Sequence, residues 1–122
     1  MTIRELYDRI GGNYDQAVRV MKSDRLIDKY VRKLLTSGVD AQLAYAGETM
    51  DAVKLFESAH AMKGVCSNLG LDALANAADE ITGEFRAGNP RRLSNDAVRE
   101  KLNAIAARFQ ATAEGIREYE DA

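Results

Sequence analysis

Between residues 51 and 69 the apolar side chains recur at a spacing that places all of them on one face of an α-helix. They fall at positions i, i+4, i+7, i+11 and i+14, and they are Leu55, Ala59, Met62, Cys66 and Leu69. A helix of about 19 residues is about 28 Å long, and an apolar seam of that length has to be buried against other helices. This segment therefore restricts the fold to a packed arrangement of helices.

The remainder of the chain has the same kind of pattern and few helix breakers, since its only proline is Pro90. Apolar periodicity and capping residues predict helices over residues 2–10, 14–21, 24–38, 51–69, 74–88 and 95–116. A further helical stretch begins at Asp40, and Gly47 is expected to interrupt it. We predict an all-α fold, an antiparallel up-and-down four-helix bundle over residues 23–122. Residues 1–22 are expected to add short helices that pack on one end of this single domain.

Composition excludes several classes of function. The 17 Lys and Arg residues are balanced by 19 Asp and Glu residues without a basic run, so we expect no nucleic acid partner. No apolar stretch approaches the roughly 20 residues that cross a bilayer, and the first 20 residues carry several charges, so we expect neither a membrane span nor a signal peptide. A single Cys and a single His exclude an internal disulfide and a Cys/His zinc site. These features favour a cytoplasmic protein, and we expect a monomer.

The sequence around His60 is the main candidate for a functional site, because motifs for nucleotide binding and for acyl transfer are absent. On a helix, His60, Lys63, Gly64 and Ser67 form one continuous row. This row lies beside the apolar seam and not within it. His60 is therefore expected to be exposed.

Gly64 is unusual because a glycine inside a helix costs about 0.5–1 kcal/mol relative to alanine. Together with the small residues Ala61 and Ser67, it leaves room beside His60 for the backbone of another molecule or for a phosphoryl group. The alternative is a surface histidine next to a glycine that serves helix packing. The residues alone leave both interpretations open.

The residues around His60 also resemble the signature of histidine phosphotransfer (HPt) domains, which relay phosphoryl groups in two-component systems. The resemblance rests on Phe56, Ala59, His60, Met62, Lys63, Gly64, Leu69, Gly70 and Leu74. The family usually has Leu where this chain has Met62, which is a volume-conserving change. The acidic residue that often closes the motif after a Leu or Met stands one place early here, as Glu80 before Ile81. The family fold is likewise an antiparallel four-helix bundle with the histidine in the middle of a helix.

The resemblance implies that His60 accepts a phosphoryl group from the aspartyl phosphate of a response-regulator receiver domain and passes it to another receiver. Through these receivers the protein would serve a hybrid sensor histidine kinase, without kinase or phosphatase activity of its own. Lys63 would stabilise the phosphoryl oxygens, and Gly64 would give access. The Mg²⁺ belongs to the receiver, so no cofactor is expected on this chain. Arg86 matches in spacing an arginine near the phosphoacceptor of some HPt proteins.

The docking surface for a receiver is expected to surround His60 and to include Glu57, Ala61, Gly64, Ser67 and Asn68. If the chain turns near Gly70, the segment of the next helix that lies level with His60 is about residues 80–83. Gly83 in that segment is either a second glycine that gives space near the site or a packing contact between helices.

Three alternatives to phosphotransfer use the same residues. A binding module of this fold would occupy a receiver domain without transferring a phosphoryl group. An enzyme with His60 as general base would need convergent polar groups, and none can be named. A metal site made of His60 and Cys66 fails because these residues lie on opposite sides of a helix. Charged neighbours such as Asp79 and Glu80 are interpreted as solvated surface.

Overall fold

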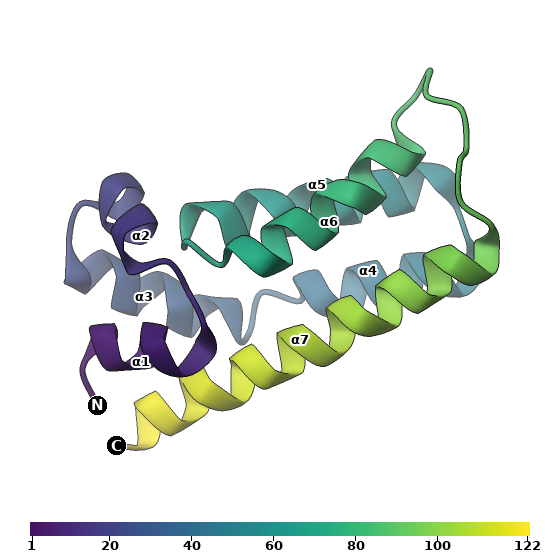
Figure 1. The fold of residues 1–122 in the computed structure, drawn as a ribbon. Coiled ribbons are helices and arrows are strands. Elements are labelled where there is room, and N and C mark those ends of the chain that lie inside the picture. The colour runs from purple at the N-terminus through teal and green to yellow at the C-terminus, as the bar shows by residue number, and fades with distance from the viewer.

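Every regular element of the structure is an α-helix, as the sequence predicts (Figure 1). The computed structural model describes residues 1–122. Its seven helices are α1 (Ile3–Ile10), α2 (Tyr14–Met21), α3 (Asp24–Leu34), α4 (Val39–Thr49), α5 (Ala52–Asn68), α6 (Asp72–Phe85) and α7 (Asn95–Asp121). Five of them begin after a side chain that accepts a hydrogen bond from the first turn, which fixes their starts. These N-cap residues are Thr2, Asn13, Ser23, Asp51 and Ser94.

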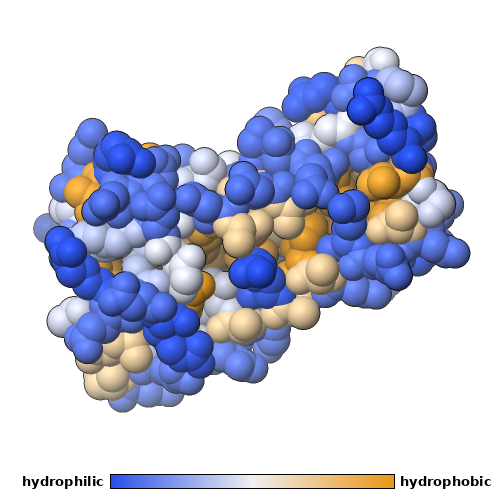
Figure 2. Space-filling model, in the orientation of Figure 1, coloured by the Kyte–Doolittle hydropathy of each residue, from blue (hydrophilic) through white to orange (hydrophobic).

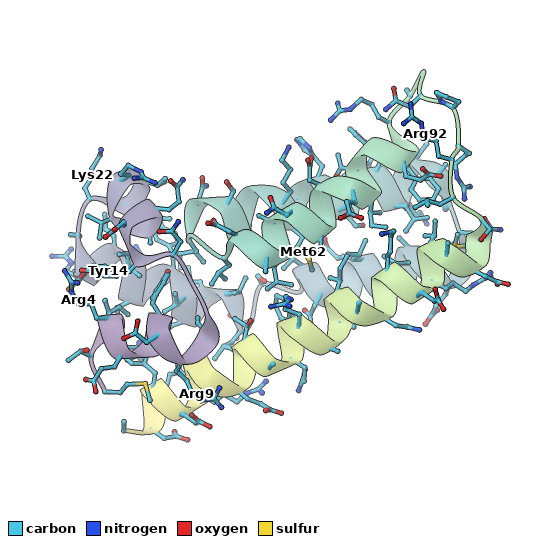
Figure 3. All side chains as sticks on the ribbon, in the orientation of Figure 1. Arg4, Arg9, Tyr14, Lys22, Met62 and Arg92 are labelled. Carbon is cyan, nitrogen blue, oxygen red and sulfur yellow. The ribbon has the colours of Figure 1, made fainter.

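Four of these helices form the bundle. Helix α4 packs against α5 and α7, α6 packs against the same two helices, and consecutive members run in opposite directions (Figure 1). The prediction of an antiparallel up-and-down four-helix bundle is therefore confirmed. The core of the chain is one cluster of 25 buried residues, to which all seven helices contribute. Met62, in the middle of the α5 seam, lies in the interior of this bundle (Figure 3).

The helix predicted over residues 24–38 begins at Asp24 as expected but is four residues too long, because this segment contains the whole of α3 (Asp24–Leu34) and the turn of residues 35–38 that precedes α4. The Ser37 hydroxyl donates a hydrogen bond to the Leu34 carbonyl (2.8 Å), and Gly38 adopts a left-handed φ of 76°. These local interactions end α3 at Leu34 and let α4 continue in roughly the same direction (Figure 1).

The predicted interruption at Gly47 is also wrong, since α4 runs through this residue to Thr49. A Cβ atom at Gly47 would lie 2.6 Å from Cδ1 of Leu102 on α7. The glycine therefore allows α4 and α7 to approach each other closely. Its role is in packing between helices and not in breaking one.

Helix α6 ends at Phe85, before the predicted end at Gly88. The cause is Glu84, whose Oε2 accepts hydrogen bonds from the Arg91 side chain (2.8 Å) and from the backbone N–H groups of Arg92 and Leu93 (both 2.9 Å). These hydrogen bonds, with the one from Leu93 first, lower the pKa of the Glu84 carboxyl. They fold residues 86–94 back over the end of α6, and Arg92 lies in this loop (Figure 3).

Helices α1 and α2 hold the turn between α5 and α6. The buried Tyr7 hydroxyl donates a hydrogen bond to the Leu69 carbonyl (2.6 Å), and the Asn13 N–H donates to the Gly70 carbonyl (2.8 Å). Burial raises the pKa of Tyr7. Gly70 has a φ of 68°, and a Cβ there would lie only 2.2 Å from the Asn13 carbonyl oxygen. The N-terminal helices thus cap the end of the bundle at which the α5–α6 turn lies.

The outward faces of α6 and α7 are largely hydrophilic, with apolar residues along the seam where the two helices meet (Figure 2). None of the helices combines the length and the apolar character that a membrane crossing requires.

Candidate functional site

The seam of α5 is buried and His60 lies outside it. Leu55, Ala59, Met62 and Cys66 are fully buried, whereas His60 is exposed. The prediction that the histidine row lies beside the seam is therefore confirmed. Because the ring stands in the middle of a 17-residue helix, its backbone is held rigidly by the turns on both sides.

The imidazole of His60 stacks on the ring of Phe56, one helical turn earlier. The two ring centroids are 5.6 Å apart, and the planes are inclined by 16°. The guanidinium carbon of Arg86 lies 5.2 Å from the Phe56 centroid. Arg86, the residue that follows α6, therefore approaches the site by contacting Phe56. This role of Phe56 was not predicted from the sequence, although its spacing of four residues from His60 is a sufficient signal.

Lys63 makes an ion pair across the α5–α6 contact. Its Nζ atom lies 2.8 Å from Oδ1 of Asp79, and the two side chains are 39% and 55% exposed. Glu80, the next residue, forms an ion pair with the helix on its other side, since its Oε2 atom lies 2.7 Å from Nζ of Lys101 on α7. The interpretation of Asp79 and Glu80 as solvated surface was thus incomplete, because each of these carboxylates connects two helices.

The Lys63–Asp79 and Phe56–Arg86 contacts fit a single antiparallel register of α5 and α6. In this register Thr82 lies opposite His60, which agrees with the expected segment 80–83. Gly83 follows Thr82, on the side of α6 that also carries Asp79 and Arg86. A Cβ at Gly83 would meet no atom within 4 Å, so close packing between helices does not explain this glycine.

The other side of His60 is open. Helical geometry places four residues on the side of His60 that faces away from α6, namely Glu57, Ala61, Gly64 and Asn68. Ser67 lies two turns after His60 in the same row. All of them except the half-buried Ser67 are exposed. A Cβ at Gly64 would meet no atom within 4 Å, so there is free space beside the imidazole. The residues expected to form the docking surface therefore lie on one continuous strip of α5.

An apolar groove continues this strip toward α2 and α3. Val65 and Asn68 form its α5 side, and its other walls carry Val20, Met21, Leu26, Tyr30, Lys33, Leu34, Ser37 and Leu69. Val20 and Tyr30 are among the most exposed large apolar side chains of the chain.

Cys66 points away from all of these groups. The thiol is fully buried, and burial raises its pKa to about 12. A metal site that joins Cys66 to His60 is therefore excluded by geometry, in agreement with the sequence analysis.

The structure is an up-and-down four-helix bundle that presents one exposed histidine in the middle of a helix, beside a glycine and a lysine, and this arrangement agrees with the class of histidine phosphotransfer modules. Comparison with protein families supports this class, since the Hpt domain family matches residues 25–115. The chain belongs to the Hpt domain family. Hpt domains carry out histidine phosphotransfer in phosphorelays and interact with response-regulator receiver domains, and they are neither kinases nor phosphatases. Searches of curated proteins and of solved structures found no match.

Proposed function

We propose that His60 is the phosphoacceptor of this Hpt domain. It accepts a phosphoryl group from the aspartyl phosphate of one receiver domain and passes it to another. The observation that carries the proposal is the exposed imidazole in the middle of α5, with open space at Gly64 and with Lys63 one helical turn away.

The transfer step needs no additional base. The new N–P bond is formed by a lone pair of the neutral imidazole, on the ring nitrogen that lies farther from the backbone. The P–O bond to the receiver aspartate breaks as the N–P bond forms, and the released carboxylate keeps the electron pair. The reverse step passes the phosphoryl group to the next receiver. Such transfers depend mainly on positioning and on stabilisation of charge.

The neighbouring side chains supply this positioning and charge. Stacking against Phe56 limits rotation of the imidazole, and Arg86 on the Phe56 ring limits the movement of Phe56 in turn. Lys63 is one turn from His60, where its ammonium stabilises the phosphoryl oxygens. Gly64 leaves the space through which the receiver aspartate approaches the ring.

The receiver docks on the open strip made of Glu57, Ala61, Gly64, Ser67 and Asn68, with the groove between α2, α3 and α5 beside it. The contact is transient, because a relay must release each partner. The receiver contributes the aspartate and its Mg²⁺, and the chain itself needs no cofactor. A hybrid sensor histidine kinase supplies the phosphoryl group through the donor receiver.

The test is phosphoryl transfer from a phosphorylated receiver domain to the purified protein, compared with the His60→Gln variant. We expect an acid-labile label on the wild type and none on the variant. Receivers that bind the protein but do not label it would refute the proposal. That result would indicate instead a module that only sequesters receivers.

A further inference from the structure

The Lys63–Asp79 ion pair bears directly on the proposed chemistry of His60. The lysine that stands one turn from the phosphoacceptor has its ammonium 2.8 Å from a carboxylate on the neighbouring helix. Neither partner is buried, since the side chains are 39% and 55% exposed. Because Lys63 is three residues after His60 on the same helix, a phosphoryl group on His60 comes close to the ammonium that Asp79 holds.

The two anions compete for one cation. A phosphoryl group brings negative charge on three oxygens close to Lys63, and these oxygens attract the ammonium away from Asp79. The Asp79 carboxylate also repels the incoming phosphoryl group. The loss of the Lys63–Asp79 ion pair and the repulsion by Asp79 both raise the free energy of the phosphorylated protein relative to the unphosphorylated one.

We propose that Asp79 is a positioning residue that holds Lys63 in the unphosphorylated protein and thereby limits how strongly His60 retains a phosphoryl group. This inference rests on the proposed function of His60. It assigns to Asp79 a regulatory part in the relay, because a carrier that held the group too tightly would not pass it on.

The remaining charged groups around His60 do not take this part. Arg86 contacts the face of Phe56, and Glu57 lies on the open side of the helix. Glu80 follows Asp79 and is equally exposed, but its partner is Lys101 of α7. Glu80→Gln therefore removes the same charge from the next position without releasing Lys63, and it is the matched control for Asp79→Asn.

The experiment uses phosphoramidate as the phosphoryl donor, so that receiver docking does not enter. Its phosphoryl group moves to the imidazole as its P–N bond breaks and ammonia leaves. The phosphorylated fraction of His60 at fixed concentrations of phosphoramidate and ammonia and the lifetime of the product are followed by ³¹P NMR. The proteins compared are the wild type, Asp79→Asn, Glu80→Gln, Lys63→Met and the Lys63→Met/Asp79→Asn double variant.

We expect Asp79→Asn to raise the ratio of phosphorylated to free His60 by about two- to fivefold, the equilibrium effect of one exposed ion pair. Glu80→Gln leaves the ratio unchanged, and the gain is reduced in the Lys63→Met background, because only the repulsion remains there. The gain also decreases at high salt. The inference would be overturned if Asp79→Asn and Glu80→Gln gave the same ratio of phosphorylated to free His60. It would also be overturned if Asp79→Asn raised this ratio as much in the Lys63→Met background as in the wild type. Absence of any label on wild-type His60 would refute the proposed function instead.

Discussion

Replacement of Gly64 by alanine separates the stability of α5 from access to His60. The substitution adds one methyl group in the interior of a helix, next to the imidazole. A Cβ at this position would contact no atom within 4 Å, so the folded protein accommodates it without strain.

The expected effect on stability is therefore the helix propensity difference alone, a gain of about 0.5–1 kcal/mol in the free energy of unfolding. For a chain of this size that gain raises the melting temperature by about 2–5 °C. The effect on transfer has the opposite sign. A methyl group in a close intermolecular contact costs about 1–3 kcal/mol, which corresponds to a reduction of about fivefold or more in transfer from a receiver at subsaturating concentration.

Two assays test this reasoning on the same protein. Thermal unfolding followed by circular dichroism gives the stability, and quenched reactions with a phosphorylated receiver give the transfer rate. Phosphoramidate is much smaller than a receiver, so its reaction with His60 should change little. Asn103→Ala, an exposed helix position on α7, controls for stabilisation of the bundle, because α7 lies diagonally across the bundle from α5. A Gly64→Ala protein that is more stable and still accepts phosphoryl groups from the receiver at the wild-type rate would refute the access argument.

Further predictions concern stability, pH and thiol reactivity. Gly70→Ala should lower the free energy of unfolding in urea by about 3 kcal/mol or more, because a left-handed backbone and a clash with the Asn13 carbonyl act together. Gly11→Ala, with a φ of 69° and free space around its Cβ, should show only the smaller backbone effect, and equal losses would contradict the clash. The lowered pKa of Glu84 stabilises the fold above the unfolded value of about 4.3, and this contribution is lost as the pH falls through the folded value. The amide signals of residues 86–94 should therefore change first on acidification in NMR spectra, and an unchanged loop at a pH where Glu84 is protonated would disprove the link. Cys66, with its pKa raised to about 12 by burial, should react with a disulfide reagent at pH 8 only when urea unfolds the protein. Rapid modification of the folded protein would show that the thiol is accessible.

The sequence predicts those features that depend on residues close together in the chain. The period of the α5 seam is sufficient to place Cys66 inside and His60 outside, because the phase of a helix is fixed by its apolar positions. The stacking of Phe56 on His60 was not predicted, although it is local in the same sense, since these residues are one turn apart.

The features that the sequence does not predict depend on tertiary contacts. Helix α6 ends early because Glu84 binds backbone groups of a loop that follows it. The glycine at position 47 within a continuous α4 is explained by the close approach of Leu102 from α7. Asp79 acquires its partner only after the α5–α6 turn has set the register of the two helices. No periodic pattern within one helix contains such information.

The contacts made by α1 and α2 have a consequence for the order in which the chain assembles. The Tyr7 hydroxyl and the Leu69 carbonyl are separated by 62 positions in sequence, whereas α5 and α6 are joined by a tight turn. During synthesis α1 and α2 leave the ribosome before α5 and α6, and the turn that they hold does not exist until residue 72 has emerged. The apolar faces around Leu6, Tyr7 and Ala17 therefore remain without their final partner while most of the chain is made. We expect the N-terminal helices to dock late, since their contacts close the longest loop. Helices α1 and α2, although synthesised before the bundle helices, would then be among the last to reach their native position, and pulse-labelling amide exchange during refolding would detect that order.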